Sequence, residues 1–574
     1  MPEAGKRFAF CFSTASGHTN PSFPIARQLV KRGHSVTYLS SAVFKGAIEA
    51  TGAAFVDEVE ELSELMQPDP AKPRAENFMS AFLALATEFG KDAAHGYGNI
   101  KQWAATHNIA IERQLPAFLR FFSEENGALK FDAAVYDNLM LGVVAHACRL
   151  LNLPAVALCT VAGPGSMEVL TREMASNEGV TLEDMDRLSF DDEDGAKAVA
   201  RLRERYPSLE LPSHPFSCGT WQYIGGPRAM TLVTTIEPLR DPISDNVSEA
   251  LRAADVRFTY IGPSLDVKGA KRAGGFIFDA HNEEPEDDEP KLHRHRSDLT
   301  DSSDAPLAAL QEAKQLNASV VAIYISLGTV ITSDMPMSGW TARLTDAAGK
   351  EYGITGKQLC QSVFTAAFEE FGASERGEGR SSYAQACEEG APLLIVSAGP
   401  QLDALEGLSV PPNALCRSYV AQVDILQSGL VDMFVTHGGQ NSFMESMANG
   451  VPLVVVPGFA DQPVNGRKAE AMGVGLAVAR PEEDTEAVLA RYVQDLRAAM
   501  RSVFEQEKFR AKAREMGALI AGAGGSARAA DIAEAIAATA RGSETAAASA
   551  TAPRKSYGDM FREMSAQAEA EASK

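Results

Sequence analysis

Short apolar runs recur along the chain, and each is followed by a small-residue or polar loop and then by a segment with helical spacing. The clearest case spans residues 431–462, where apolar runs at 431–435 and 453–456 flank a segment of helical character at 443–448. Glycines follow the first run, and an Asn-Gly-Val-Pro turn precedes the second. This order of strand, glycine loop, helix and strand predicts a βαβ unit in a parallel sheet.

The same pattern opens the chain. An apolar run at 8–14 is followed by a loop, a helical segment at 24–32 and a second strand at 35–39. Strands that alternate with helices indicate an α/β fold. Further strands are predicted at 133–136, 155–159, 230–234, 258–262, 320–325, 393–396 and 475–478, and further helices at 358–371, 466–472, 485–519 and 527–539.

Composition divides the chain into two halves and a tail. A length of 574 residues is enough for more than one domain. Residues 263–306 change from Gly/Lys/Arg-rich to strongly acidic, which favours a mobile linker over a metal or anion site at their His-Arg tetrad. We therefore expect domains at 1–262 and 307–540, and a low-complexity tail at 541–574 with a candidate helix near its end.

Charge and hydropathy exclude several classes of function. The formal net charge of −23 disfavours a nucleic-acid partner, because a phosphate backbone needs a basic surface. A mean hydropathy of −0.12 and the lack of any apolar run near ~18 residues argue against a membrane span. Seven cysteines without a CxxC pair fit a reducing compartment better than a disulfide framework or a zinc site, so we expect a cytoplasmic protein.

Two polar residues are predicted at the carboxyl ends of strands in the first half, where ligands of open α/β sheets bind. His18 follows the first strand, and Asp137 ends the strand at 133–136. An isolated histidine is more often a surface or core residue, but this placement favours a functional role for His18. For Asp137, a loop or N-cap role is an equal alternative.

The second half carries features of a phosphate site. The glycines at 438–439 and the helix that opens near Asn441 offer backbone N–H donors and partial positive charge, which suit a phosphate-bearing ligand. Glu445 lies one turn further on the same face and could accept hydrogen bonds from ligand hydroxyls. The small-residue loop at 326–329 is a second turn that could hold a phosphate.

The stretch 419–462 resembles the donor-binding signature of the UDP-dependent glycosyltransferase superfamily, which includes plant secondary-product, macrolide and sterol glycosyltransferases. The motif Gly17-His18-Thr19-Asn20-Pro21 resembles the N-terminus of that superfamily, and the strand ending in Asp137 is similar to the segment that carries its catalytic aspartate. The residues of the signature have matching spacing: Tyr419, Gln422, His437, Gly439, Asn441, Ser442, Glu445, Asp461 and Gln462.

The sequence departs from the plant members at two positions. Tyr419 and Gln440 stand where the plant members have tryptophan. A tyrosine ring can still stack on a base. Gln440 brings the chain nearer to the bacterial, fungal and animal members, so acceptor rules from plant enzymes do not transfer.

The resemblance implies an α/β GT-B fold, in which two Rossmann-like domains face each other across a cleft. It also implies an inverting hexosyl transfer, with glucose as the expected sugar, from a UDP-sugar to a hydroxyl of a lipophilic small molecule. The UDP-sugar is a co-substrate, and neither a cofactor nor a metal is expected. His18 would be the base and Asp137 its partner. The donor would be held at the base by Tyr419 and Gln422, at the diphosphate by Thr329, His437, Gly439, Asn441 and Ser442, at the ribose by Glu445, and at the sugar by Asp461 and Gln462.

Other functions are weaker hypotheses. A UDP-sugar epimerase or hydrolase on the same fold would need no acceptor pocket. A catalytically silent nucleotide-sugar sensor or scaffold would fit the acidic linker and the tail, but not the joint presence of His18 and Asp137. A dinucleotide oxidoreductase is disfavoured, because no G-x-G-x-x-G follows either opening strand. No motif identifies the acceptor, which loops at 62–114 and 162–221 are expected to contact.

Overall fold

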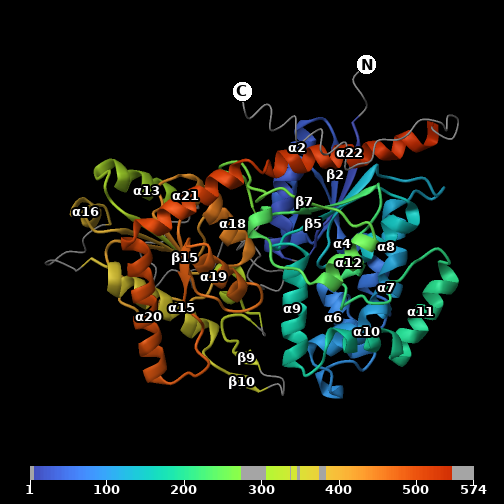
Figure 1. Ribbon diagram of the computed structural model, residues 1–574, viewed down its shortest axis with the longest axis horizontal. Coiled ribbons are helices and arrows are strands. Elements are labelled where there is room, and N and C mark those ends of the chain that lie inside the picture. The colour runs from blue at the N-terminus through green and yellow to red at the C-terminus, as the bar shows by residue number, and fades with distance from the viewer. Residues whose placement is uncertain are drawn as a thin grey trace.

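The protein is described by a computed structural model over residues 5–13, 15–272, 305–335, 338–345, 350–373 and 383–545. Two parallel sheets lie side by side, each covered by helices (Figure 1). Thr14, most of the predicted linker at 263–306 and most of the predicted tail at 541–574 lie outside the described residues.

The first sheet has seven strands in the order β3-β2-β1-β4-β5-β6-β7, and all pairings are parallel. Every residue of β4, β5 and β6 is buried, as expected for parallel strands covered on both faces. The strands are β1 Arg7–Cys11, β2 Ser35–Ser40, β3 Ala54–Asp57, β4 Ala133–Asp137, β5 Ala155–Cys159, β6 Ala229–Val233 and β7 Phe258–Tyr260.

Helices flank both faces of this sheet. The longest, α7, packs against α10 and α11 in the insertion between β5 and β6. The helices are α1 Ser16–Thr19, α2 Phe23–Lys31, α3 Lys45–Glu49, α4 Glu58–Glu61, α5 Ser63–Met66, α6 Phe78–Glu88, α7 Asn99–Phe122, α8 Gly142–Leu151, α9 Pro164–Asn177, α10 Leu182–Asp191, α11 Glu193–Arg205 and α12 Asp245–Ala253, with 3-10 turns at Asn20–Ser22, Ala42–Phe44, Ala93–His95, Thr220–Gln222 and Glu237–Leu239.

The second sheet has six parallel strands in the order β12-β11-β8-β13-β14-β15. In both sheets the chain moves from a central first strand to one edge and then crosses back, which is the Rossmann order. These strands are β8 Ala322–Ser326, β11 Leu393–Ser397, β12 Ala414–Arg417, β13 Met433–Thr436, β14 Leu453–Val455 and β15 Gly475–Ala477, and a separate antiparallel pair is formed by β9 Leu344–Thr345 and β10 Glu351–Tyr352.

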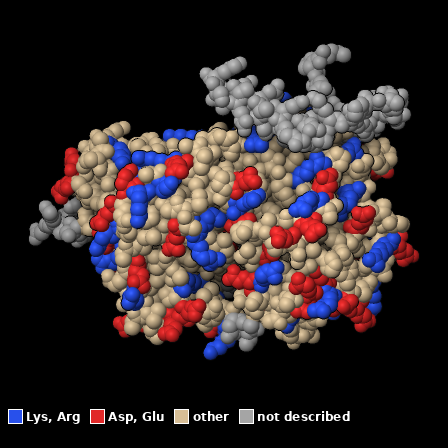
Figure 2. Space-filling model, in the orientation of Figure 1, with Lys and Arg blue, Asp and Glu red and all other residues tan. Residues whose placement is uncertain are grey.

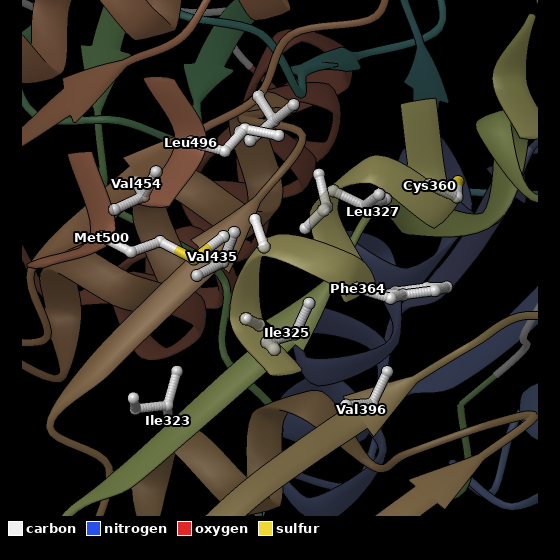
Figure 3. Packing of buried hydrophobic residues seen from close by; sticks show 14 of the residues in the cluster. Ile323, Ile325, Leu327, Cys360, Phe364, Val396, Val435, Val454, Leu496 and Met500 are labelled. Atoms are coloured by element: carbon white, nitrogen blue, oxygen red, sulfur yellow. The ribbon is translucent and has the colours of Figure 1, made fainter. Parts of the chain in front are cut away.

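Side chains of the second sheet alternate between two cores. Ile323 and Ile325 of β8 lie in the same buried cluster as Phe364 and Leu496 (Figure 3). Tyr324, between them, lies in the core on the other face. The helices around this sheet are α13 Ala305–Leu316, α14 Gly328–Ile331, α15 Gly356–Phe371, α16 Tyr383–Glu388, α17 Gln422–Gln427, α18 Gln440–Ala448, α19 Gln462–Ala471, α20 Glu486–Glu505 and α21 Glu507–Ala521.

The last helix, α22 Gly525–Thr545, returns to the first half of the molecule (Figure 1). Ile532 and Ile536 lie in the same core as Phe8 of β1. Its polar side is also fixed there, because Arg32 Nη1 is 3.0 Å from Glu534 Oε2. The sequence prediction assigns this helix to the second half, but its contacts are with the first sheet.

The structure differs from the sequence prediction at several elements. Strands β3 and β12 were not predicted, because both are short edge strands with partly exposed residues. Helix α19 was predicted to start at residue 466 in place of Gln462, although Asp461 immediately before it is a typical N-cap residue. His18 lies in the one-turn helix α1 and not in an open loop.

Positive and negative side chains are interspersed over the face shown in Figure 2. Among the helices of the described ranges, none is long and apolar enough to cross a membrane.

We expect Ile536→Ala to destabilise the first half selectively. Ile536 is fully buried, so the substitution leaves a cavity that costs about 2–5 kcal/mol. Hydrogen exchange measured by segment should show faster exchange in β1 and β4 than in the unsubstituted chain, with little change in β11 and β13. The control is Leu519→Ala at an exposed position of α21, which should change neither sheet. Faster exchange confined to the second sheet would contradict this packing.

Candidate active site

Each sheet has a crevice where the chain reverses its direction of winding, between β1 and β4 in the first sheet and between β8 and β13 in the second. The carboxyl ends of these strands carry His18 and Asp137 in the first half, and Thr329 and His437 in the second. The two crevices meet, because Asn441 Nδ2 donates a hydrogen bond to the Gly17 carbonyl at 2.5 Å. The predicted residues of both halves therefore surround a common region.

His18 and Asp137 form a close pair at the first crevice. His18 Nδ1 is 3.0 Å from Asp137 Oδ2, and the Asp137 side chain is almost fully buried. The Leu139 N–H donates to the other carboxylate oxygen at 3.0 Å, which fixes the orientation of Asp137. The His18 side chain stays 22% exposed, so the ring can be reached from the crevice.

The pKa of His18 is raised above its ordinary value of 6.5. Burial by itself lowers this pKa, but the charge and hydrogen bonding of Asp137, together with the charge of Asp461, outweigh it. Asp461 belongs to the second half, so both halves contribute to the basicity of the ring. Such a histidine is suited to accept a proton and to carry it as a paired imidazolium.

The glycine turn after β13 brings backbone close to the second crevice. Gly438 has φ +81°, and a Cβ at this position would collide with Val455. Gly439 is the N-cap of α18, so the first N–H groups of this helix, near Asn441 and Ser442, lie at the crevice. An anion at this position would meet both these donors and the positive end of the helix.

His437 lies beside the loop that carries Thr329. Burial lowers the pKa of His437 to about 4, so the ring is neutral near pH 7 and donates through one nitrogen only. Gly328, with φ +79°, packs on this ring, and a Cβ there would overlap it. A glycine at this position therefore lets Thr329 and His437 lie together at the crevice.

Glu445 is held inside a network of side chains. Gln422 Nε2 donates to Glu445 Oε2 at 2.6 Å and to Ser442 Oγ at 3.0 Å. Arg272 Nη2 donates to the other carboxylate oxygen at 3.3 Å. The neighbouring Tyr419 is 46% exposed, which leaves its ring accessible for stacking.

Asp461 and Gln462 lie at the start of α19. Asp461 Oδ2 accepts hydrogen bonds from the Gln440 N–H at 3.0 Å and from Asn465 Nδ2 at 3.1 Å. Gln462 Oε1 accepts from the N–H groups of Gly458 and Phe459, so its carbonyl group holds its own loop. Only the amide nitrogen of Gln462 is then left for a ligand.

The structure adds residues that the sequence prediction omitted. Arg272 comes from the segment predicted as a linker, and no local pattern links it to Glu445. Asn465 stands one helical turn after Asp461, and recognition of the N-cap would have placed it in the site. Asp241 and Lys468 pair across the two halves at 2.7 Å, which no sequence pattern indicates.

The described residues contain no group of three or more His, Cys, Asp or Glu side chains arranged to hold a metal ion. The metal-free expectation remains a prediction.

A shallow hollow lies in the first half between α9, α12 and the turn Thr220–Gln222. Its aromatic walls include Trp103, Phe216 and Trp221, whose rings meet edge to face. Trp221 packs so closely on Gly142 that a Cβ there would overlap the indole. Gly142 is the first residue of α8, which follows the strand of Asp137, so the hollow lies on the same side of the sheet as the crevice.

Comparisons with known proteins agree on one superfamily. A family model described as "UDP-glucoronosyl and UDP-glucosyl transferase" matches residues 403–519. The chain is 24% identical to NDP-glycosyltransferase YjiC of Bacillus subtilis (strain 168), over 90% of this chain and 93% of that protein. It is 33% identical to UDP-glucuronosyltransferase 3A1 of Mus musculus, over 18% of this chain and 19% of that protein.

Solved structures share the fold. The calicheamicin glycosyltransferase CalG4 is similar with a TM-score of 0.54 and 19% identity, over 93% of this chain and 98% of that chain. The glycosyltransferase VinC, solved in complex with DTDP, is similar with a TM-score of 0.51 and 14% identity, over 93% of this chain and 100% of that chain. The predicted GT-B fold, with two Rossmann-like sheets, is thereby confirmed.

We expect Asp137→Asn to lower the pKa of His18 below its ordinary value, because burial remains while the main opposing charge is lost. An NMR titration of the imidazole signals measures this shift. Asp132→Asn is a matched control, since Asp132 precedes the same strand at the opposite edge and accepts a hydrogen bond from the Arg7 N–H. An unchanged His18 pKa in Asp137→Asn would rule out the electrostatic coupling of this pair.

Proposed function

We propose that this chain, a glycosyltransferase that belongs to the UDP-dependent superfamily and has a GT-B fold, transfers glucose from UDP-glucose to a hydroxyl of a lipophilic small molecule. The proposed transfer inverts the configuration of the sugar and needs no metal. The observation that carries the proposal is the His18–Asp137 pair, which lies next to the start of α18 through the Asn441–Gly17 hydrogen bond. A base and a phosphate-binding helix start are thus adjacent.

The donor would lie along the second crevice. The start of α18, with Asn441 and Ser442, would hold the diphosphate together with Thr329 and His437. His437 would line the same position as a neutral ring. The helix dipole would stabilise the negative charge that builds up on UDP as it leaves, a role that a metal ion has in other enzymes.

The remaining donor residues would fix the two ends of UDP-glucose. Glu445 would accept hydrogen bonds from the ribose hydroxyls, with Gln422 and Arg272 holding its carboxylate. Tyr419 would stack on uracil through its exposed ring. Asp461 and the amide of Gln462 would bind hydroxyls of the sugar.

His18 would act as the general base. Its Nδ1 faces Asp137, which leaves Nε2 for the acceptor hydroxyl. The acceptor oxygen forms a bond to the anomeric carbon from the side opposite UDP, the bond from that carbon to the phosphate oxygen breaks, and the hydroxyl proton passes to Nε2. Attack from the opposite side inverts the configuration, and the buried Asp137 carboxylate stabilises the imidazolium.

The aromatic hollow supports an acceptor with a flat apolar body. Trp103, Phe216 and Trp221 offer stacking and edge contacts but little hydrogen bonding. A screen of UDP-sugars against a pooled library of phenolic, polyketide and sterol acceptors, with mass detection of glycosides, tests both the sugar and the acceptor class. Turnover of UDP-sugar without any glycoside would favour an epimerase or hydrolase instead.

We expect His18→Ala to reduce sugar transfer by on the order of 10²–10⁴-fold, because the general base is lost. Binding of UDP should persist, since the donor residues lie in the second half. Initial rates of glycoside formation and calorimetry with UDP measure the two effects. His95→Ala, at a 60% exposed histidine, serves as the control. Equal transfer rates for His18→Ala and the unsubstituted chain would refute the assignment of the base.

We expect Glu445→Ala to weaken UDP binding by about 10-fold or more, the range for losing charge-assisted hydrogen bonds to the ribose. Calorimetry at constant pH gives the Kd. Glu483→Ala removes an exposed carboxylate of the same half and should leave the Kd unchanged. If Glu445→Ala also leaves it unchanged, the ribose is bound elsewhere.

A further inference from the structure

A buried ion pair joins the two halves near the proposed sugar position. Lys468 Nζ of α19 is 2.7 Å from Asp241 Oδ1, and the two side chains are only 12% and 4% exposed. Asp241 lies just after the turn Glu237–Leu239 of the first half, and Ser166 Oγ of α9 donates to its other oxygen at 2.6 Å. First-half residues thus reach the helix that carries Asp461 at its start.

Stability alone is a weak reason for such a pair. Removing two charges from water costs free energy that their mutual attraction often only balances, and apolar residues would fill the same space at no loss. A buried ion pair can instead fix the position of a neighbouring side chain. The contacts of Lys468 extend from this pair into the site.

A continuous series of contacts leads from the pair to Asp461. Lys468 Nζ donates to Asn465 Oδ1 at 3.3 Å. Asn465 Nδ2 donates in turn to Asp461 Oδ2 at 3.1 Å and to the Gly438 carbonyl at 2.9 Å. The hydrogen bonds from the Gln440 N–H and from Asn465 Nδ2 both end on Oδ2, so Oδ1 has more capacity to accept a hydrogen bond from a sugar hydroxyl.

The pair also adjusts the charge around Asp461. Burial raises the pKa of Asp461 and the charge of Asp241 adds to the rise, while hydrogen bonds from backbone N–H groups and the charge of Lys468 oppose it. His18 faces Asp461 from α1, and its own pKa is raised by that carboxylate. Lys468 therefore favours the ionised form of Asp461, and Asp241 disfavours it.

We propose that Asp241 and Lys468 are positioning residues for the donor sugar: through Asn465 their ion pair holds the Asp461 carboxylate in place for a sugar hydroxyl and ties that placement to the first half. This inference rests on the proposed function of the site. It assigns a role to a contact between the halves that lies outside the donor signature.

The test compares UDP with UDP-glucose as calorimetric probes, using the full chain between pH 4.5 and pH 8. The ratio of the Kd for UDP to the Kd for UDP-glucose reports the sugar contact. The terminal phosphate of UDP takes up a proton near about pH 6 and UDP-glucose has no such group, so the ratio for each variant is divided by that of the unsubstituted chain at the same pH, which cancels the ionisation of the probe. The variants are Lys468→Met, Asp241→Asn and the double substitution. Lys512→Met is the matched control, because it removes the lysine of an exposed ion pair with Glu515 in the same half.

We expect Lys468→Met to weaken UDP-glucose relative to UDP by about 10-fold at pH 7, the size of one charge-assisted hydrogen bond. The preference for UDP-glucose over UDP should fall as Asp461 takes up a proton. Compared with the unsubstituted chain, this fall should occur at a higher pH in Lys468→Met and at a lower pH in Asp241→Asn. In the double variant this pH should be close to that of the unsubstituted chain, because both of the opposite charges are gone. A merely structural role would not give shifts of opposite sign.

Equal ratios and equal pH profiles in all variants would overturn the inference. If Lys468→Met does not fold, Asp241→Asn and the double variant still decide, since the double variant leaves no unpaired buried charge. Failure of the proposed function gives a different result: the unsubstituted chain would bind neither UDP nor UDP-glucose and would form no glycoside in the acceptor screen.

Discussion

The direction of the parallel strands is the constraint on which the rest of the molecule depends. In a parallel sheet all carboxyl ends lie at one edge, and a crevice opens where the winding reverses. Here each sheet places its polar residues at that reversal, His18 and Asp137 in one and Thr329 and His437 in the other. The Asn441–Gly17 hydrogen bond brings the two crevices together, so that neither half holds the whole site.

Burial then sets the charge state of the site. The same loss of hydration lowers the pKa of His437 to about 4 and raises that of Asp461, whereas His18 keeps a raised pKa because carboxylates of both halves face it. One histidine is thus neutral beside the proposed diphosphate position, and another is basic beside the proposed acceptor position. The difference arises from neighbours and not from residue type.

Local periodicity explains which parts of the fold could be predicted. The unit β13-α18-β14 follows from apolar runs and a glycine turn within about 30 residues, and the predicted GT-B fold agrees with the structure. The edge strands β3 and β12 are not predicted, because each is only four residues long and shows no clear alternation of apolar and polar positions. The apolar face of α22 was visible in the sequence, but its spacing does not say which of two sheets it covers.

The sequence by itself determined the order of elements, the strand ends at which His18, Asp137 and His437 lie, and the resemblance that names the donor. Only the tertiary structure decided that His18 lies 3.0 Å from Asp137, that Arg272 pairs with Glu445, and that Lys468 reaches Asp241. The physical reason is the range of each signal. Side-chain periodicity and the hydrogen bonds within a helix or turn act over a few residues, whereas these contacts join segments far apart in the chain and depend on how two sheets pack.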